Sequence, residues 1–220
     1  MRGSALALAF ALAAPTLLAA GGCTTAYYGA MEQLGQHKRD ILKSRIESGR
    51  EEQQEAQEQF KTTYQRFKEV AGSDGGDLEA TYDRLNTEYE RSEARAQDVR
   101  DRIASIEQVS SDLFAEWQSE IDSMQSASLK SQSSRSLRDT KAKYTKLIGA
   151  MKKAEAKMPP VLTAFRDQVL FLKHNLNARA IASLSGSLGE IESDVDALIR
   201  DIDASIRESE SFLATLENAS

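Results

Sequence analysis

The sequence predicts an all-α protein, an elongated antiparallel coiled-coil or helical bundle made of two long helical hairpins. Two observations carry this prediction. The 220 residues contain only three prolines, two of them the adjacent pair Pro159 and Pro160, and twelve glycines, so long helices can run without a break. Between a few turn signals, apolar residues recur in alternating steps of four and three, which is the spacing of a coiled-coil seam.

The first 22 residues are predicted to be a signal peptide that is removed from the mature protein. Arg2 supplies a positive charge, and residues 4–20 form an apolar run with the length of a signal-peptide core. That run is too short and too rich in small residues for a comfortable membrane span.

The segment from Leu18 to Cys23 resembles the bacterial lipobox, in which the cysteine is diacylated and becomes the first residue after cleavage. The alternative is a secreted protein with a free thiol. Because an unpaired thiol is unusual in an oxidising compartment, lipidation of Cys23, the only cysteine, is favoured. Each buried lipid methylene contributes about 0.8 kcal/mol, so the anchor would be effectively permanent. The resemblance implies the periplasmic face of the outer membrane, because Thr24 stands where an aspartate would retain the protein in the inner membrane.

Residues 23–127 are predicted to form the N-terminal hairpin, with a first helix from about residue 28 to residue 71. The glycine-rich turn signal at 72–77 separates its two helices, and Asp77 is placed to cap the second one. The two seams are expected to pack against each other. The seam residues are Leu42, Ile46, Gly49, Gln53, Ala56, Phe60, Thr63, Phe67 and Val70, followed by Leu78, Tyr82, Leu85, Tyr89, Ser92, Ala96, Val99, Ile103, Ile106, Ser110, Leu113 and Trp117.

Residues 128–220 are predicted to form a C-terminal hairpin packed on the first. The serine-rich stretch 126–136 favours a loop or a frayed helix end, and the chain is expected to fold back through Pro159 and Pro160. The segment 161–184 is apolar on more than one stripe, which predicts a helix buried by several neighbours. Ser187 and Glu190 have the spacing of a capping box, and Gly186 and Gly189 stand beside them. This pattern predicts a kink or break at 185–189. The seam residues are Leu137, Thr140, Tyr144, Leu147, Met151, Ala154 and Met158, then Leu162, Phe165, Val169, Leu172 and Leu176, then Leu188, Ile191, Val195, Leu198, Ile202, Phe212 and Leu216.

Charge is unevenly distributed along the chain. The net charge of −6 argues against a protein that binds nucleic acid through overall positive charge. Residues 128–158 carry nine basic and two acidic side chains, whereas residues 77–127 carry five basic and thirteen acidic ones. One interpretation is that the basic helix pairs with acidic neighbours; the other is that its lysines form a basic interaction face for an anionic lipid, a polysaccharide or an acidic partner. These lysines are Lys141, Lys143, Lys146, Lys152, Lys153 and Lys157.

A second candidate site is the polar segment between positions 166 and 179, which lies within the stretch expected to be heavily buried. Buried charges need partners, so these side chains are interpreted either as an internal salt-bridge and hydrogen-bond network or as the lining of a polar cleft that binds an anion. They are Arg166, Asp167, Lys173, His174, Asn175 and Arg179.

Motifs that carry chemistry are missing from the sequence. There is no phosphate-binding G-x-x-x-x-G-K-[ST] or G-x-G-x-x-G, no H-E-x-x-H and no G-x-S-x-G. With one cysteine and two histidines, no catalytic residues, metal ligands or cofactor can be named, so the protein is not expected to be an enzyme.

Several stretches resemble a bacterial lipoprotein family known as domain of unknown function 2959. They are residues 27–32, 34–35, 37–42 and 74–79 and, most specifically, the block from Ala164 to Leu184. The resemblance implies a Gram-negative envelope lipoprotein and brings no activity, ligand or catalytic residue. The expected role is a structural or protein-interaction scaffold that binds an envelope protein or a second copy of itself, through apolar seams left incomplete or through the basic helix. The alternative is an envelope binding module that recognises an anionic lipid or cell-wall ligand.

Overall fold

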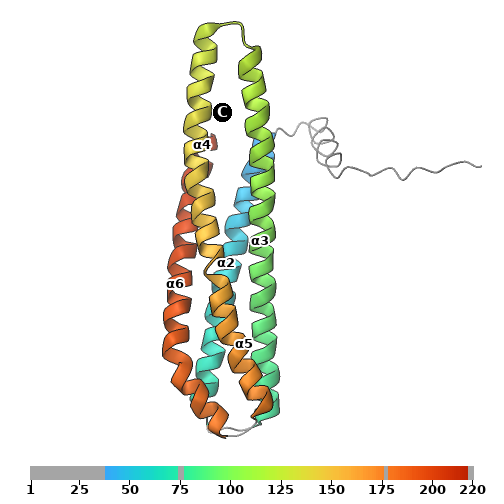
Figure 1. Ribbon diagram of the computed structural model, residues 1–220, viewed down its shortest axis with the longest axis vertical. Helices are drawn as coiled ribbons and strands as arrows, with labels where there is room; N and C mark the ends of the chain where they lie inside the picture. The colour runs from blue at the N-terminus through green and yellow to red at the C-terminus, as the bar shows by residue number, and fades with distance from the viewer. Residues whose placement is uncertain (1–37, 74–76, 176–177, 218–220) are drawn as a thin grey trace, which may run out of the picture. The chain divides into compact units, whose positions relative to one another are not determined.

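The computed structural model describes residues 38–73, 77–175 and 178–217, and every regular element among them is a helix (Figure 1). The helices are α2 (Lys38–Ala71), α3 (Leu78–Ser123), α4 (Ala127–Glu155), α5 (Met158–His174) and α6 (Ala178–Glu217). The predicted all-α helical bundle is therefore confirmed.

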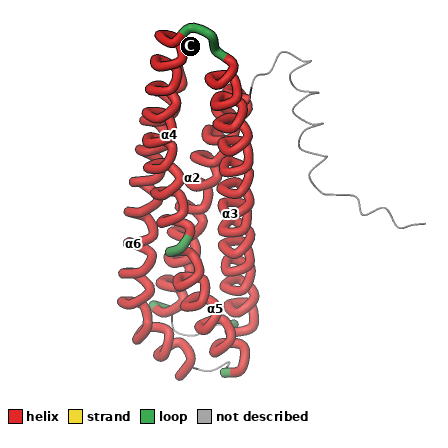
Figure 2. The backbone as a smooth tube through the Cα atoms, turned by 45° about the horizontal axis from the view of Figure 1, so that its top comes forward, coloured by secondary structure: helices red, strands yellow, loops and turns green. Residues whose placement is uncertain are grey.

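The five helices form four columns, because α4 and α5 follow one another end to end in the same direction (Figure 1, Figure 2). Each column packs against two neighbours: α2 against α3 and α6, and the α4–α5 column against α3 and α6. The α2–α3 pair is antiparallel, since Lys38 contacts Glu116, Glu52 contacts Arg102 and Thr63 contacts Ser92. At 1.5 Å per residue the 34 residues of α2 span about 50 Å, so these residues build a long bundle.

The core lies where the predicted seams meet. All nine seam residues of α2 are buried, and the central part of the α3 seam is buried against them. Burial selects one side of each helix, and a helix presents the same side every three to four residues, which is why periodicity located these residues. The largest fully buried side chains include Phe60, Phe67, Phe165 and Phe212.

The predicted cap of α3 is present. The Asp77 carboxylate accepts hydrogen bonds from the backbone N–H groups of Glu79 and Ala80, both at 3.1 Å. Two backbone donors that the first helical turn cannot satisfy are thereby paired.

The predicted reversal at Pro159 and Pro160 is wrong. Both prolines lie in the first turn of α5, where a helix needs no backbone N–H donor. The two residues at the α4–α5 junction, Ala156 and Lys157, keep right-handed helical backbone angles, so the chain continues in its direction. It reverses between α5 and α6 instead.

The expected burial of a single helix over 161–184 is also wrong. α5 ends at His174 and α6 begins at Ala178, so the apolar residues of this stretch belong to two different columns. Their stripes differ because each column faces the core from its own side. Part of α5 faces outward, with Leu170 41% and Phe171 38% exposed.

Two further stretches contain more helix than the sequence predicts: α4 begins at residue 127 within the serine-rich stretch, and residues 185–189 do not break α6. In the serine-rich stretch, Ser126 caps α4 by accepting from the Leu129 N–H, and the Ser134 hydroxyl donates to the Lys130 carbonyl within the helix. α6 runs through residues 185–189 without a break, and the Ser187 hydroxyl donates to the Ser183 carbonyl instead of capping a new helix.

Candidate functional site

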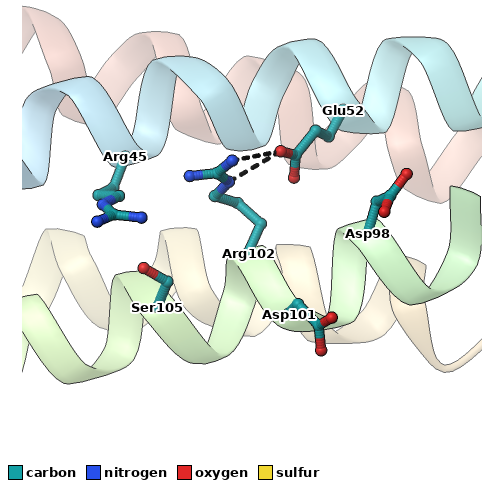
Figure 3. Close-up of a pocket in the computed structure, with 6 residues that line it drawn as sticks. All are labelled: Arg45, Glu52, Asp98, Asp101, Arg102 and Ser105. Atoms are coloured by element: carbon teal, nitrogen blue, oxygen red, sulfur yellow. Dashed lines mark hydrogen bonds and ion pairs between the residues drawn. The ribbon is translucent and has the colours of Figure 1, made fainter.

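The surface between α2 and α3 contains a shallow groove of about 240 Å³ (Figure 3). Arg102 of α3 reaches across it, and its Nε and Nη2 donate to Glu52 Oε1 of α2 at 3.0 and 2.5 Å. This hydrogen bond raises the pKa of Arg102 above its usual value. The groove is lined by Arg45, Glu52, Asp98, Asp101, Arg102 and Ser105.

The groove is chiefly a connection between two helices. Glu52 and Arg102 pair with each other, Asp98 accepts from Arg95 at 3.3 Å, and Asp101 accepts from Gln97 at 2.7 Å. A second shallow groove along the same helix pair contains an ion pair between Arg95 and Glu55 at 2.8 Å. These bridges fix how α2 and α3 align, and most of the charged groups in the first groove already have partners.

The predicted polar segment lies mainly on the surface. Arg166, Asp167, Lys173 and His174 of α5 are exposed, and no ion pair joins them to any other residue in the described part of the chain. Asn175 ends α5 and donates to the Phe171 carbonyl, while the side chain of Arg179 lies outside the described side chains. The interpretation as a buried salt-bridge network is therefore wrong, because the helix turns this side away from the core.

The predicted basic face is divided between the two interpretations. Lys152 pairs with Glu107 of α3 at 2.5 Å, and Lys153 pairs with Asp201 of α6 at 2.7 Å. The hydrogen bond to Glu107 raises the pKa of Lys152. Lys143 donates to Thr215, and Lys141 lies 5.6 Å from the centre of the Phe114 ring.

The remaining two lysines of that face behave differently. Lys146 and Lys157 are exposed, and their side chains make no hydrogen bond or ion pair with the residues that the structure describes. Lys152 and Lys153 thus link α4 to its neighbours through exposed ion pairs, whereas Lys146 and Lys157 stay available to solvent.

The core contains hydrogen-bonded side chains whose pairing the sequence did not reveal. Ser205 of α6 donates to Gln53 Oε1 at 2.7 Å, and the Thr63 and Ser92 hydroxyls are 2.8 Å apart. Gln53 and Thr63 are visible in the sequence as polar positions in an apolar seam. Their partners lie 152 and 29 residues away, and periodicity gives the side of a helix that is buried but not what it meets.

Other features of a site can be stated only for the described residues. Among them, no group of three or more His, Cys, Asp or Glu side chains could hold a metal ion. Within the same ranges, no helix is both long and apolar enough to cross a membrane. Cys23, the predicted lipidation site, and the predicted signal peptide lie outside these ranges.

The bundle and its surface define an all-helical protein with charged helix faces and shallow polar grooves. The family model described as "Protein of unknown function (DUF2959)" matches residues 27–216, and the chain belongs to this family. No curated protein and no solved structure was found to be similar to the chain.

Proposed function

We propose that this protein is a lipid-anchored scaffold of the bacterial envelope, without catalytic activity, held by Cys23 at the periplasmic face of the outer membrane. The signal-peptide pattern and the lipobox-like sequence before the single cysteine support the anchor. A bundle attached at one end would present its long helical faces to other envelope components.

The distribution of charge on the bundle is the observation that carries the scaffold role. α3 carries twelve Asp and Glu against five Lys and Arg, and α6 carries nine against three, while residues 127–174 carry three against eleven. Separate faces of opposite charge favour association with charged partners and fix their orientation. The predicted seam of α2 is fully buried, so the expected attraction through incomplete seams is not favoured along that helix.

Crosslinking in intact cells tests this proposal. The tethered protein is crosslinked and purified, and everything attached to it is identified by mass spectrometry. The matched control carries Cys23→Ala behind a leader that is cleaved without lipidation, so that the same domain is exported without an anchor. A protein partner captured only by the tethered form is expected; capture of no protein, or equal capture by both forms, would contradict an anchored scaffold.

A second candidate function is a binding module for an anionic envelope ligand. It is favoured by the exposure of Arg166, Lys173 and His174, which have no ion-pair partner among the described residues. We expect Arg166→Ala to leave the thermal unfolding temperature unchanged within about 1 °C, because an exposed side chain without partners contributes little to stability. A clear fall in that temperature would instead return this residue to a structural role.

A further inference from the structure

The α4–α5 column, residues 127–174, is the basic side of the bundle. It carries eleven Lys and Arg against three Asp and Glu, and the two columns beside it, α3 and α6, are strongly acidic. Neighbouring acidic columns explain the pairing of Lys152 and Lys153, which lie on its flanks. They do not explain the basic side chains on its outer side.

The outer side of α4 can be assigned from the residues that the helix buries. Leu137, Leu147 and Met151 face the core, and Arg138 is exposed on the opposite side. Lys146 is exposed on the outer edge that it shares with Lys153, seven residues later. A Cβ atom added to Gly149 would meet no other atom within 4 Å, so this position also faces solvent.

Five cationic side chains of the column are exposed and make no hydrogen bond, ion pair or aromatic-ring contact with any described residue. Ion pairs join many of the other charges of the bundle, whereas these side chains have none. Arg166 lies near Tyr89 of α3, and its charge offsets part of the rise in the pKa of that tyrosine. The five are Arg138, Lys146, Lys157, Arg166 and Lys173.

Exposed apolar side chains accompany these cations. Within the described ranges, the large apolar side chains that stand out as exposed are Leu129 at 59%, Leu170 at 41% and Phe171 at 38%. Leu129 lies five full turns before the buried Leu147, on the core-facing side of α4, so only Leu170 and Phe171 bear on the outer surface of the column.

Leu170 is four residues after Arg166 and three before Lys173, so these three side chains share one side of α5. Phe171 lies on a different side, together with the exposed acid Asp167 four residues earlier. Basic residues combined with exposed Leu and Phe on one helix are typical of segments that lie at the interface of an anionic bilayer.

We propose that the α4–α5 column lies along the surface of an anionic phospholipid bilayer, so that the long axis of the bundle is parallel to the membrane. The basic side chains contact lipid phosphates, and Leu170 enters the headgroup region. This inference rests on the proposed lipid anchor, which keeps the bundle close to a bilayer. The negative net charge does not oppose it, because the screening length at physiological salt is only about 8 Å and the nearest side chains dominate.

Fluorescence quenching on vesicles tests the orientation. The purified mature protein is inserted through its anchor into vesicles of phosphatidylglycerol and phosphatidylethanolamine that contain a lipid with a nitroxide headgroup as quencher. A fluorophore is attached either to Lys146→Cys or to Ser44→Cys, an exposed position on α2. Gly49 packs against Met151 across the core, so Ser44 and Lys146, each five residues earlier, lie at the same height on diagonally opposite columns.

The label at position 146 is expected to be quenched more strongly than the label at position 44, and this excess is expected to disappear in high salt or in vesicles of phosphatidylcholine alone. The triple variant Arg138→Glu, Lys157→Glu and Arg166→Glu is expected to lose the excess as well. The control variant Lys61→Glu, Arg66→Glu and Lys68→Glu makes the same change in net charge on α2 and is expected to keep it. Circular dichroism verifies that both variants remain helical.

Equal quenching at the two positions, or stronger quenching at position 44, would overturn the proposed orientation. Persistence of the excess in the α4–α5 triple variant would show that these cations do not set it. If a protein is crosslinked to position 146 in cells while the vesicle experiment shows no excess, the face binds an acidic partner and the membrane inference is wrong. The intact mass of the purified protein reports lipidation of Cys23 separately, so failure of the anchor is distinguished from failure of the orientation.

Discussion

Two parts of the core are built on opposite principles. In the aromatic layer, Phe165 of α5 stacks on Phe67 and Phe60 of α2, with ring centres 5.1 and 6.1 Å apart, and all three side chains are fully buried. In the polar cluster between α2 and α6, Ser205 donates to Gln53, and Gln57 donates to Asp203 at 2.7 Å. The aromatic layer is stabilised by the burial of apolar surface, and the polar cluster is joined by hydrogen bonds that require a particular geometry.

The difference separates stability from alignment. Apolar burial contributes free energy with little regard to direction, so the aromatic layer would tolerate small shifts between helices. A hydrogen bond between two buried side chains requires one alignment, because a shift leaves a buried donor or acceptor without a partner. We infer that the aromatic layer supplies most of the stabilisation and that the polar cluster fixes the register of α6 on α2.

The largest expected effect comes from truncating the aromatic layer. Phe165→Ala should reduce the free energy of unfolding by about 3–5 kcal/mol, because it removes a buried ring and leaves a cavity. Urea denaturation followed by circular dichroism measures this loss. Phe171→Ala is the matched control, since it makes the same chemical change on the outward side of the same helix and should cost far less. Equal losses for the two variants would contradict the assignment of α5's buried side.

The next prediction concerns Gly49, which lies one helical turn before Gln53 of the polar cluster, where neighbouring helices approach closely. A Cβ atom at Gly49 would lie 3.0 Å from Ile106 Cδ1 and 3.0 Å from Met151 Cε. Gly49→Val should therefore destabilise the bundle by about 1–3 kcal/mol through overpacking. Gly149→Ala, at an open helical position, should instead stabilise it by up to about 1 kcal/mol because alanine favours the helix. Thermal unfolding of both variants measures the contrast, and a stabilised Gly49→Val protein would show that this approach is loose.

A smaller effect is expected in the polar cluster. Ser205→Ala should cost about 1–2 kcal/mol, because Gln53 Oε1 loses its partner while it stays buried. Adding Gln53→Leu should recover most of this loss, since an apolar side chain of similar size needs no partner. A double variant less stable than Ser205→Ala would show that Gln53 stabilises the core through contacts other than its hydrogen bond with Ser205.

The same contrast explains what the sequence could predict. The seams around Phe60 and Leu147 were predictable because burial of one side imposes a period on apolar residues. The pairing of Gln53 with Ser205 was not, because a period contains no information about which distant helix supplies a hydroxyl group.

The prediction of the topology was wrong for a related reason. Adjacent prolines suit the first turn of a helix whether or not the chain reverses before it, so Pro159 and Pro160 did not distinguish a hairpin from a continued column. The chain turns beyond His174, where Asn175 and Asn177 were the available signal, because asparagine favours turns. When that turn is overlooked, the sequence pattern combines the apolar stripes of two columns into one buried helix and predicts burial for the exposed residues near Arg166.

The smallest effect concerns Tyr144, which combines the two principles in one side chain. Its ring packs edge-to-face on Phe114 and Phe212, with ring centres 5.4 and 6.2 Å apart. Burial raises the pKa of Tyr144 above 10, and a hydrogen bond with Ser110 opposes this shift in part.

Below the pKa that Tyr144 has in the unfolded chain, the side chain is neutral in both states, so the stabilisation is complete there. As the pH rises, the unfolded tyrosine ionises first, and stability is lost until the pH passes the higher pKa of the folded state. Urea denaturation between about pH 9 and pH 11 should show this fall, and Tyr144→Phe should make it shallower. A fall should remain in the variant, because Tyr64 and Tyr89 also have raised pKa values. An unchanged slope in Tyr144→Phe would mean that the ring is solvated enough to ionise as it does in the unfolded chain.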